Sequence, residues 1–155
     1  MLDDKFVKRT LESAKTIAMI GVSSIKKEVS SNIRRSPSTI VMKYMQEFGY
    51  KVIPVNPFSA GERIHGEIIV AKLSEVRIPI DIVDVFRPSK ETPPIAEEAV
   101  KIGAKVFWLQ YGIQNDEAKK IVESKNIAYI SNKCIKQEYQ RLFLKISPVF
   151  PALKN

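Results

Sequence analysis

The strongest constraint on the fold of this chain is a regular alternation of apolar segments with amphipathic segments of helical spacing. Five apolar segments rich in Ile and Val occur, at residues 16–22, 50–55, 80–86, 105–109 and 126–130. Near-continuous apolar runs of this length are typical of strands that are covered on both faces, as parallel sheets require. The alternation therefore indicates strands that are joined by helical crossovers.

The segments between the apolar runs carry helix start and stop signals. One helix begins at Ser36-Pro37, where a serine can cap the first free amides and a proline suits the first turn, and it stops at Gly49. A second runs from Pro93-Pro94 to Gly103, and a third begins at Asn115; each ends just before the next apolar run. Two further helices are expected to flank the unit, over residues 3–14 and 136–144.

We therefore predict an α/β fold, a Rossmann-like, doubly wound, five-stranded parallel sheet with helices on both faces. The 155 residues correspond to about one domain, which we place at residues 1–146, with a C-terminal tail at residues 147–155. In such sheets ligands bind at the carboxyl ends of the strands, near the point where the strand order reverses. The residues that directly follow each strand are thus the candidate site residues.

The composition excludes several other classes of protein. Hydrophobic residues make up 45% and charged residues 27% of the chain, as in an ordinary globular domain. One cysteine and one histidine exclude an internal disulfide framework and a Cys/His zinc site within one chain, and we expect no metal site. No apolar run approaches ~18 residues and the N-terminus lacks a signal-peptide core, so we expect a cytoplasmic protein with no membrane span.

The net charge points to an anionic partner. Lys and Arg number 25 against 17 Asp and Glu, a formal charge of +8, which favours nucleic acid, an acidic membrane surface or a phosphorylated small molecule. Nucleic acid is disfavoured because the basic residues are spread over several helices and no basic strand with interleaved aromatic residues occurs. The basic loop at residues 25–35 leads into a helix N-terminus, which makes its Lys27 and Arg35 candidates for phosphate contacts.

The turn after the first strand, Gly21-Val22-Ser23-Ser24, is the first candidate site. Its glycine allows a tight turn and the close approach of a ligand, and the serines supply hydroxyl and amide donors for phosphate. Only one of the three glycines of the dinucleotide-binding fingerprint is present. A plain strand-to-loop turn remains the alternative.

The later strand ends add further candidates. Asn56-Pro57 stands where a nicotinamide-binding Rossmann domain generally has an acid for the ribose hydroxyl, so NAD is disfavoured. After the third strand, the arginine of Phe86-Arg87 can grip a phosphate and the phenylalanine can pack on adenine or an aliphatic arm. Gln110 and Gly112 follow the fourth strand, and Cys134 the fifth. A surface arginine beside a turn and a packed structural thiol are the alternatives.

Taken in order, these segments resemble the small stand-alone CoA-binding protein family, which shares its Rossmann-like fold with the CoA-binding domain of the succinyl-CoA synthetase alpha subunit. The resemblance covers residues 16–142 and rests on IGVS at 20–23, VMKY at 41–44, GYKVIPVNP at 49–57, DIVDVFR at 81–87, GAK at 103–105, WLQ at 108–110 and NKC at 132–134. The segment from Ser24 to Ser36 departs from the family, because it is longer and more basic than the usual loop.

The resemblance implies that coenzyme A or an acyl-CoA binds at the carboxyl ends of the strands. The implied contacts are Gly21, Val22, Ser23, Asn56, Pro57, Phe86, Arg87 and the segment from Gln110 to Gly112. CoA carries about four negative charges, which suits a basic chain. We expect no catalytic residue, because the synthetases use a phosphorylated histidine on a separate downstream domain, whereas the only histidine here, His65, lies in a glycine-rich turn.

Two other functions remain open from the sequence. An NADP-binding protein is the first, since Arg34, Arg35 or Arg87 could hold a 2′-phosphate. An enzyme component that handles acyl-CoA is the second, with Cys134 as the candidate nucleophile. The apolar tail at residues 147–153 is compatible with a homodimer.

Overall fold

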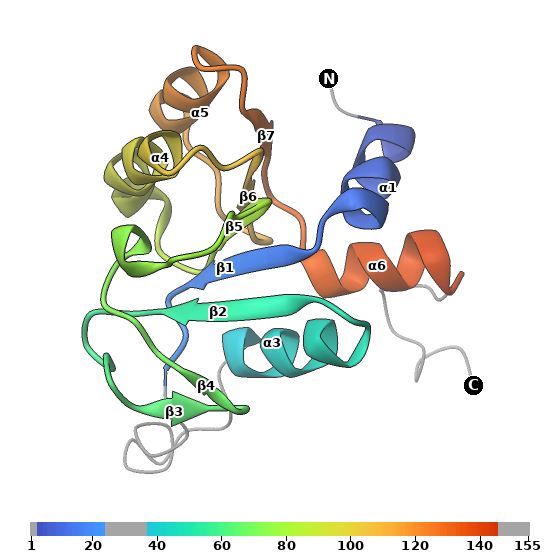
Figure 1. Cartoon of the computed structure of the whole chain (residues 1–155). Helices are drawn as coiled ribbons and strands as arrows, with labels where there is room; N and C mark the ends of the chain where they lie inside the picture. The colour runs from blue at the N-terminus through green and yellow to red at the C-terminus, as the bar shows by residue number, and fades with distance from the viewer. Residues whose placement is uncertain (1–2, 24–36, 146–155) are drawn as a thin grey trace.

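The computed structural model describes residues 3–23 and 37–145 (Figure 1). Five parallel strands form the main sheet and confirm the predicted Rossmann-like α/β fold. They are β1 (Thr16–Ile20), β2 (Lys51–Val55), β5 (Ile82–Val85), β6 (Val106–Leu109) and β7 (Ala128–Ile130). Each lies within one of the five apolar segments of the sequence, because those segments supply side chains for both faces of the sheet.

Helices cover both faces of the sheet, as predicted (Figure 1). They are α1 (Asp4–Ser13), α3 (Pro37–Glu47), α4 (Thr92–Lys101), α5 (Asp116–Glu123) and α6 (Ile135–Phe143), with short 3₁₀ turns η1 (Leu73–Glu75) and η2 (Ser89–Glu91). Helices α1, α3 and α6 lie on one face, and α4 and α5 on the other. Within the described residues every helix is too short or too polar to cross a lipid bilayer.

The core follows the two-residue period of the strands. In β1, Ile17 and Met19 join the apolar cluster under α1, α3 and α6, whereas Ala18 and Ile20 join the cluster under α4 and α5. All residues of β1, β5 and β6 are buried. The three central strands are therefore covered on both faces.

One acidic side chain interrupts this apolar interior. Asp84 in β5 is fully buried and lies in register between Met19 and Trp108. Neither of its carboxyl oxygens has a hydrogen-bond partner among the described residues. Burial raises the pKa of the Asp84 carboxyl well above its ordinary value of 3.8, because a charged carboxylate is poorly solvated there.

The strand order places a switch point next to β1. The order is β2-β1-β5-β6-β7, so the chain first moves to one side of β1 through α3 and later adds β5 on the other side. The connections that leave β1 and β5 thus diverge to opposite faces, which opens a crevice at their carboxyl ends. This is where the sequence predicts the binding site.

A two-stranded hairpin, which the sequence analysis did not predict, lies along the outer edge of β2. It consists of β3 (Arg63–Ile64) and β4 (Glu67–Ile68), joined by His65 and Gly66, which both have positive φ. Two-residue turns of this kind need positive φ at both positions, and the strands are too short to show a periodic pattern. Lys51 and Glu67 form an ion pair of 2.7 Å that ties the hairpin to β2.

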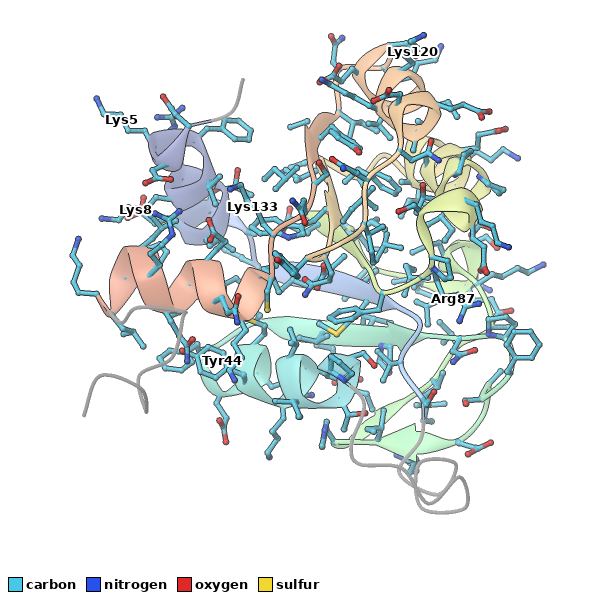
Figure 2. All side chains as sticks on the ribbon, turned by 180° about the vertical axis from the view of Figure 1, so that it is seen from behind. Lys5, Lys8, Tyr44, Arg87, Lys120 and Lys133 are labelled. Carbon is cyan, nitrogen blue, oxygen red and sulfur yellow. The ribbon has the colours of Figure 1, made fainter. Side chains whose placement is uncertain are left out.

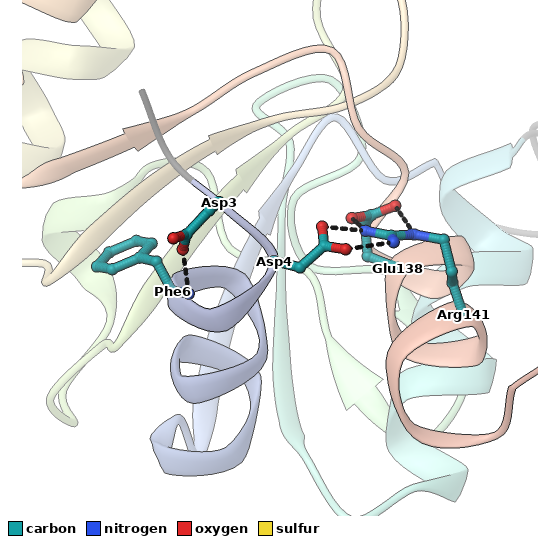
Figure 3. Close-up of polar contacts among 5 residues, drawn as sticks. All are labelled: Asp3, Asp4, Phe6, Glu138 and Arg141. Carbon is teal, nitrogen blue, oxygen red and sulfur yellow. Dashed lines mark hydrogen bonds and ion pairs between the residues drawn. The ribbon is translucent and has the colours of Figure 1, made fainter.

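Helix α1 is capped and clamped by two acidic residues (Figure 3). The Asp3 carboxylate accepts the N–H of Phe6 at 3.0 Å, as an N-cap should. Asp4 accepts two hydrogen bonds from Arg141 of α6, at 2.8 and 2.9 Å, and Arg141 also donates to Glu138 at 2.7 Å. This clamp joins the two ends of the described chain on one face of the sheet. The hydrogen bond from Arg141 lowers the pKa of the Asp4 carboxyl.

Candidate functional site

Gly21 ends β1 at the switch point and lies directly against the end of β5. Its φ is +99°, and a Cβ there would lie 2.8 Å from the carbonyl oxygen of Phe86 and 3.2 Å from Cδ of Arg87. Its N–H donates to the carbonyl of Val55 at the end of β2, at 2.8 Å. Both the backbone angle and the missing side chain are therefore needed for these three strand ends to meet.

Arg87 follows β5 and lies against Gly21. Its Nε and Nη2 both donate to Oε1 of Glu91, at 3.0 and 2.9 Å, and its side chain is 36% exposed. A guanidinium has five N–H donors, so the pairing with Glu91 orients the group and leaves further donors unused. Among the described residues Nη1 has no partner, so Arg87 can still donate to an anion.

Two cavities meet at Gly21 and Arg87, the two residues that line both. The larger has a volume of about 730 Å³ and lies between the ends of β1 and β2 and the start of α4, where Pro57, Lys72 and Ile95 contribute to its wall. The smaller, about 480 Å³, lies between the start of α3 and the start of α6. Each volume is within the range of small-molecule sites, and together they form a crevice along the carboxyl edge of the sheet.

Asn56 and Val22 hold the loops of this edge together. The Asn56 side chain donates to the carbonyl of Val22 at 3.1 Å and accepts the N–H of Phe58 at 2.9 Å. Asn56 is 7% exposed and Val22 is fully buried. Their polar groups thus position Gly21 and the exposed Pro57, and a direct contact of either residue with a ligand stays a prediction.

The smaller cavity is lined by two of the remaining predicted residues but not by Gly112. Phe86 and Gln110 line it. Gln110 is 5% exposed, and its Oε1 accepts the N–H of Ile135 at 3.1 Å, at the first turn of α6. The N–H of Gly112 donates to Oδ1 of Asn132 at 2.7 Å, so Gly112 joins the loop after β6 to the loop after β7.

Three predicted contacts cannot be placed. Ser24, Lys27 and Arg35 lie outside the described residues, and Ser23, which is half-buried, is the last residue described before that segment. The contribution of the basic loop to phosphate binding therefore stays a prediction.

The structure also places at the crevice three residues that the sequence analysis did not select, together with Tyr111 of the predicted segment from Gln110 to Gly112. Lys72, Lys90 and Phe58 line the larger cavity, and Tyr111 lines the smaller. Phe58 and Tyr111 are 74% and 76% exposed, which is unusual for large aromatic side chains. Phe58 lies three residues after the predicted strand at 50–55, so a wider window after that strand would have included it.

The other cations of the described chain are spread over the molecule. Figure 2 shows Lys5 and Lys8 on α1, Lys120 on α5 and Lys133 before α6, all on elements other than the one that carries Arg87. Positive charge that is spread in this way attracts anions to the whole molecule but defines no single binding position. Within the described residues, the groups at the crevice are therefore the ones that could define where an anion binds.

His65 has a structural role at the hairpin turn. Its Nε2 lies 3.1 Å from the carbonyl oxygen of Thr39, and its own carbonyl accepts a hydrogen bond from Gln46 at 3.1 Å. These contacts join the hairpin to α3. No group of three or more His, Cys, Asp or Glu side chains in the described part of the chain is arranged to hold a metal ion.

A doubly wound sheet with a glycine turn at its switch point is the architecture of the Rossmann-like class, in which many nucleotide-binding domains fall. Comparison with protein families assigns the family within that class, because residues 15–140 match the model of the CoA binding domain. The chain belongs to this CoA-binding domain family, as its strand-end motifs predicted.

Known proteins of similar size share the sequence and the fold. The uncharacterized protein YneT of Bacillus subtilis (strain 168) is 39% identical over 130 residues, which cover 84% of this chain and 89% of YneT. A solved structure from Thermus thermophilus, cell-free ID.343, has a TM-score of 0.82 at 34% identity and covers 92% of this chain and all of that one. A hypothetical protein from Pyrococcus horikoshii OT3 has a TM-score of 0.81 at 34% identity, with 91% and 92% covered.

Proposed function

We propose that the protein binds coenzyme A, free or acylated, in the crevice at the carboxyl ends of β1, β2, β5 and β6. Membership of the CoA-binding domain family supports the ligand. The observation that carries the position is that Gly21 and Arg87 line both cavities, at the point where Gly21 approaches the end of β5 too closely for a Cβ. A binding role without catalysis is the form of the proposal that the described residues support.

The residues at the crevice fit the chemical groups of CoA. The turn at Gly21 and the spare donors of Arg87 suit a pyrophosphate, which needs close backbone approach and charged hydrogen bonds. Lys72 and Lys90 at the larger cavity add positive charge, and Phe58 adds an exposed aromatic face for a base. Two connected cavities also suit a long ligand with a nucleotide at one end and an extended arm at the other.

Isothermal titration of the full chain with CoA, dephospho-CoA, acetyl-CoA and NADP tests this proposal. We expect CoA and acetyl-CoA to bind more tightly than dephospho-CoA and NADP, because both carry the 3′-phosphate and the arm. Replacing Arg87 by Gln should weaken CoA binding by about tenfold or more, as expected for a lost charged hydrogen bond. The matched control is Arg77→Gln, which removes the same charge from an exposed residue in the connection that precedes β5.

Two results would contradict the proposal. One is equal binding of all four compounds or no binding of any. The other is the same loss of affinity in Arg87→Gln and Arg77→Gln, which would indicate a general charge effect in place of a defined contact. Tighter binding of NADP than of CoA would favour the alternative nucleotide.

A further inference from the structure

The single cysteine of the chain lies inside the candidate site. Cys134 lines the smaller cavity together with Gly21, Arg87 and Gln110. It is half-buried and packs against the apolar cluster beneath α6. It occupies the N-cap position of α6, but its side chain makes no capping hydrogen bond, so the thiol is not used by the helix that follows it.

The loop that carries Cys134 is held in place from the neighbouring strand end. Trp108 in β6 donates its indole N–H to the carbonyl of Lys133 at 2.7 Å. Asn132 accepts the N–H of Gly112 at 2.7 Å and donates its own N–H to the carbonyl of Ile113 at 3.1 Å. These bonds fix the two residues before Cys134 to β6 and to the loop that follows it, and so they position Cys134 at the edge of the cavity.

Gln110 adds hydrogen-bond donors to the cavity that holds Cys134. The residue is 5% exposed and lines the cavity, and its Oε1 is occupied by the N–H of Ile135. That bond fixes the amide plane, and the Nε2 donors have no partner among the described residues. These donors can therefore bond to an acceptor that a ligand places in the cavity. An amide carbonyl, of which the arm of CoA carries two, is a suitable acceptor.

We propose that the smaller cavity holds the thiol-bearing arm of CoA and that Cys134 forms a mixed disulfide with it when the CoA pool is oxidised. This inference rests on the proposed function and adds a covalent, redox-dependent state of the same site. Under reducing conditions the ligand is held only by non-covalent contacts. Under oxidising conditions it is retained through Cys134 and released by a thiol reductant.

The exchange is balanced with CoA disulfide as the oxidant. Cys134 loses its proton to solvent, and the resulting thiolate attacks one sulfur of the CoA disulfide. The sulfur–sulfur bond of the CoA disulfide breaks as the bond between Cys134 Sγ and the retained CoA sulfur forms. The second CoA leaves as a thiolate and takes up a proton, so no further electron donor or acceptor is needed.

Intact-protein mass spectrometry after incubation of the full chain with CoA disulfide tests this inference. We expect one CoA adduct per chain, removed by dithiothreitol and absent in Cys134→Ser. Because the chain has one cysteine, the adduct has one possible position. The folded protein should react with CoA disulfide on the order of tenfold faster than with glutathione disulfide, since the site holds the first reagent next to the thiol.

Two comparisons separate a site from a merely accessible thiol. In denaturing urea the two disulfides should react at similar rates, because the cavity is lost. Gln110→Glu keeps the acceptor for Ile135 but removes the donors, and it should reduce the preference for CoA disulfide by about fivefold, the value of one hydrogen bond. Equal rates of the two disulfides with folded protein, or no adduct, would overturn the inference.

A separate titration distinguishes failure of this inference from failure of the proposed function. Titration of wild-type protein with CoA in dithiothreitol measures the non-covalent site alone. Binding there without a preferred adduct would remove only the role of Cys134. Absence of binding there would remove the proposed function as well.

Discussion

At the scale of single residues, the candidate site depends on what Gly21 lacks and on what Arg87 retains. Position 21 combines a left-handed backbone angle with a carbonyl 2.8 Å from where a Cβ would be, so two separate physical reasons exclude a side chain. Arg87 is held by Glu91 yet keeps donors for an anion. The first residue lets the ends of β1 and β5 meet beside both cavities, and the second keeps a charge that suits a phosphate.

A comparison of Gly21→Ala with Gly49→Ala should separate the effect of the left-handed backbone angle from the effect of the steric clash. Both glycines have φ of +99°, but no atom lies within 4 Å of a Cβ at Gly49. Each variant should lose about 1–2 kcal/mol of unfolding free energy from the backbone angle, and Gly21→Ala should lose more because of its clash. Urea unfolding measures the difference. Equal stability of the two variants, or unchanged CoA binding in Gly21→Ala, would contradict the role given to the close approach.

At the scale of elements, the molecule is held together by contacts between segments that are distant in sequence. Helix α1 begins the described chain and α6 ends it, and Arg141 joins them through Asp4 while it also pairs with Glu138 (Figure 3). The side chain of Glu138 is 10% exposed, whereas that of Asp4 is 64% exposed. The buried member of the triad therefore depends most on the arginine.

Arg141→Gln should destabilise the fold by leaving Glu138 without its cationic partner. We expect a loss of about 1–3 kcal/mol in unfolding free energy, measured by urea denaturation. Asp4→Asn is the matched variant, and it should cost less because the Asp4 carboxylate is open to solvent. If Asp4→Asn were the more destabilising of the two, the clamp would depend on the exposed pair.

At the scale of the whole molecule, the buried Asp84 couples the central sheet to pH. Its folded-state pKa is raised, so the folded form binds the proton more tightly than the unfolded chain does. The stabilising contribution of the protonated group is complete below pH 3.8. It is lost as pH rises from that value to the folded-state pKa, at roughly 1.4 kcal/mol per pH unit.

Asp84→Asn should remove this loss and make the protein more stable than wild type at neutral pH. Thermal unfolding of both proteins between pH 4 and 8 measures this difference in stability.

Asp81→Asn is the control for which we expect the opposite effect. Burial alone would raise the pKa of the Asp81 carboxyl, but the backbone N–H groups of Lys15 and Thr16, together with Lys105, lower it. Wild-type Asp81 therefore contributes stability above pH 3.8 that is lost at lower pH, so its replacement should destabilise at neutral pH. A neutral-pH melting temperature unchanged by Asp84→Asn would contradict the assignment of a raised pKa.

The sequence alone determined the class of fold and the edge at which to search for a site. Apolar runs and helix signals are local patterns, and they located the five strands of the main sheet because a doubly covered strand must be apolar on both faces. The motifs at the strand ends are also local patterns, because each lies within a single short segment, and they indicated the family correctly.

Tertiary structure decided which of those strand-end residues face a ligand space and which hold the frame. Val22 proved to be buried in loop contacts, whereas Asn56 bonds to Val22 and also lines the larger cavity. Cys134, from the far end of the chain, was brought to the same cavity as Gly21. The short hairpin beside β2 and the strand order were likewise absent from any local pattern. The physical reason is that cavities and hydrogen-bond partners are set by packing between segments many residues apart, and single-sequence periodicity carries no record of that packing.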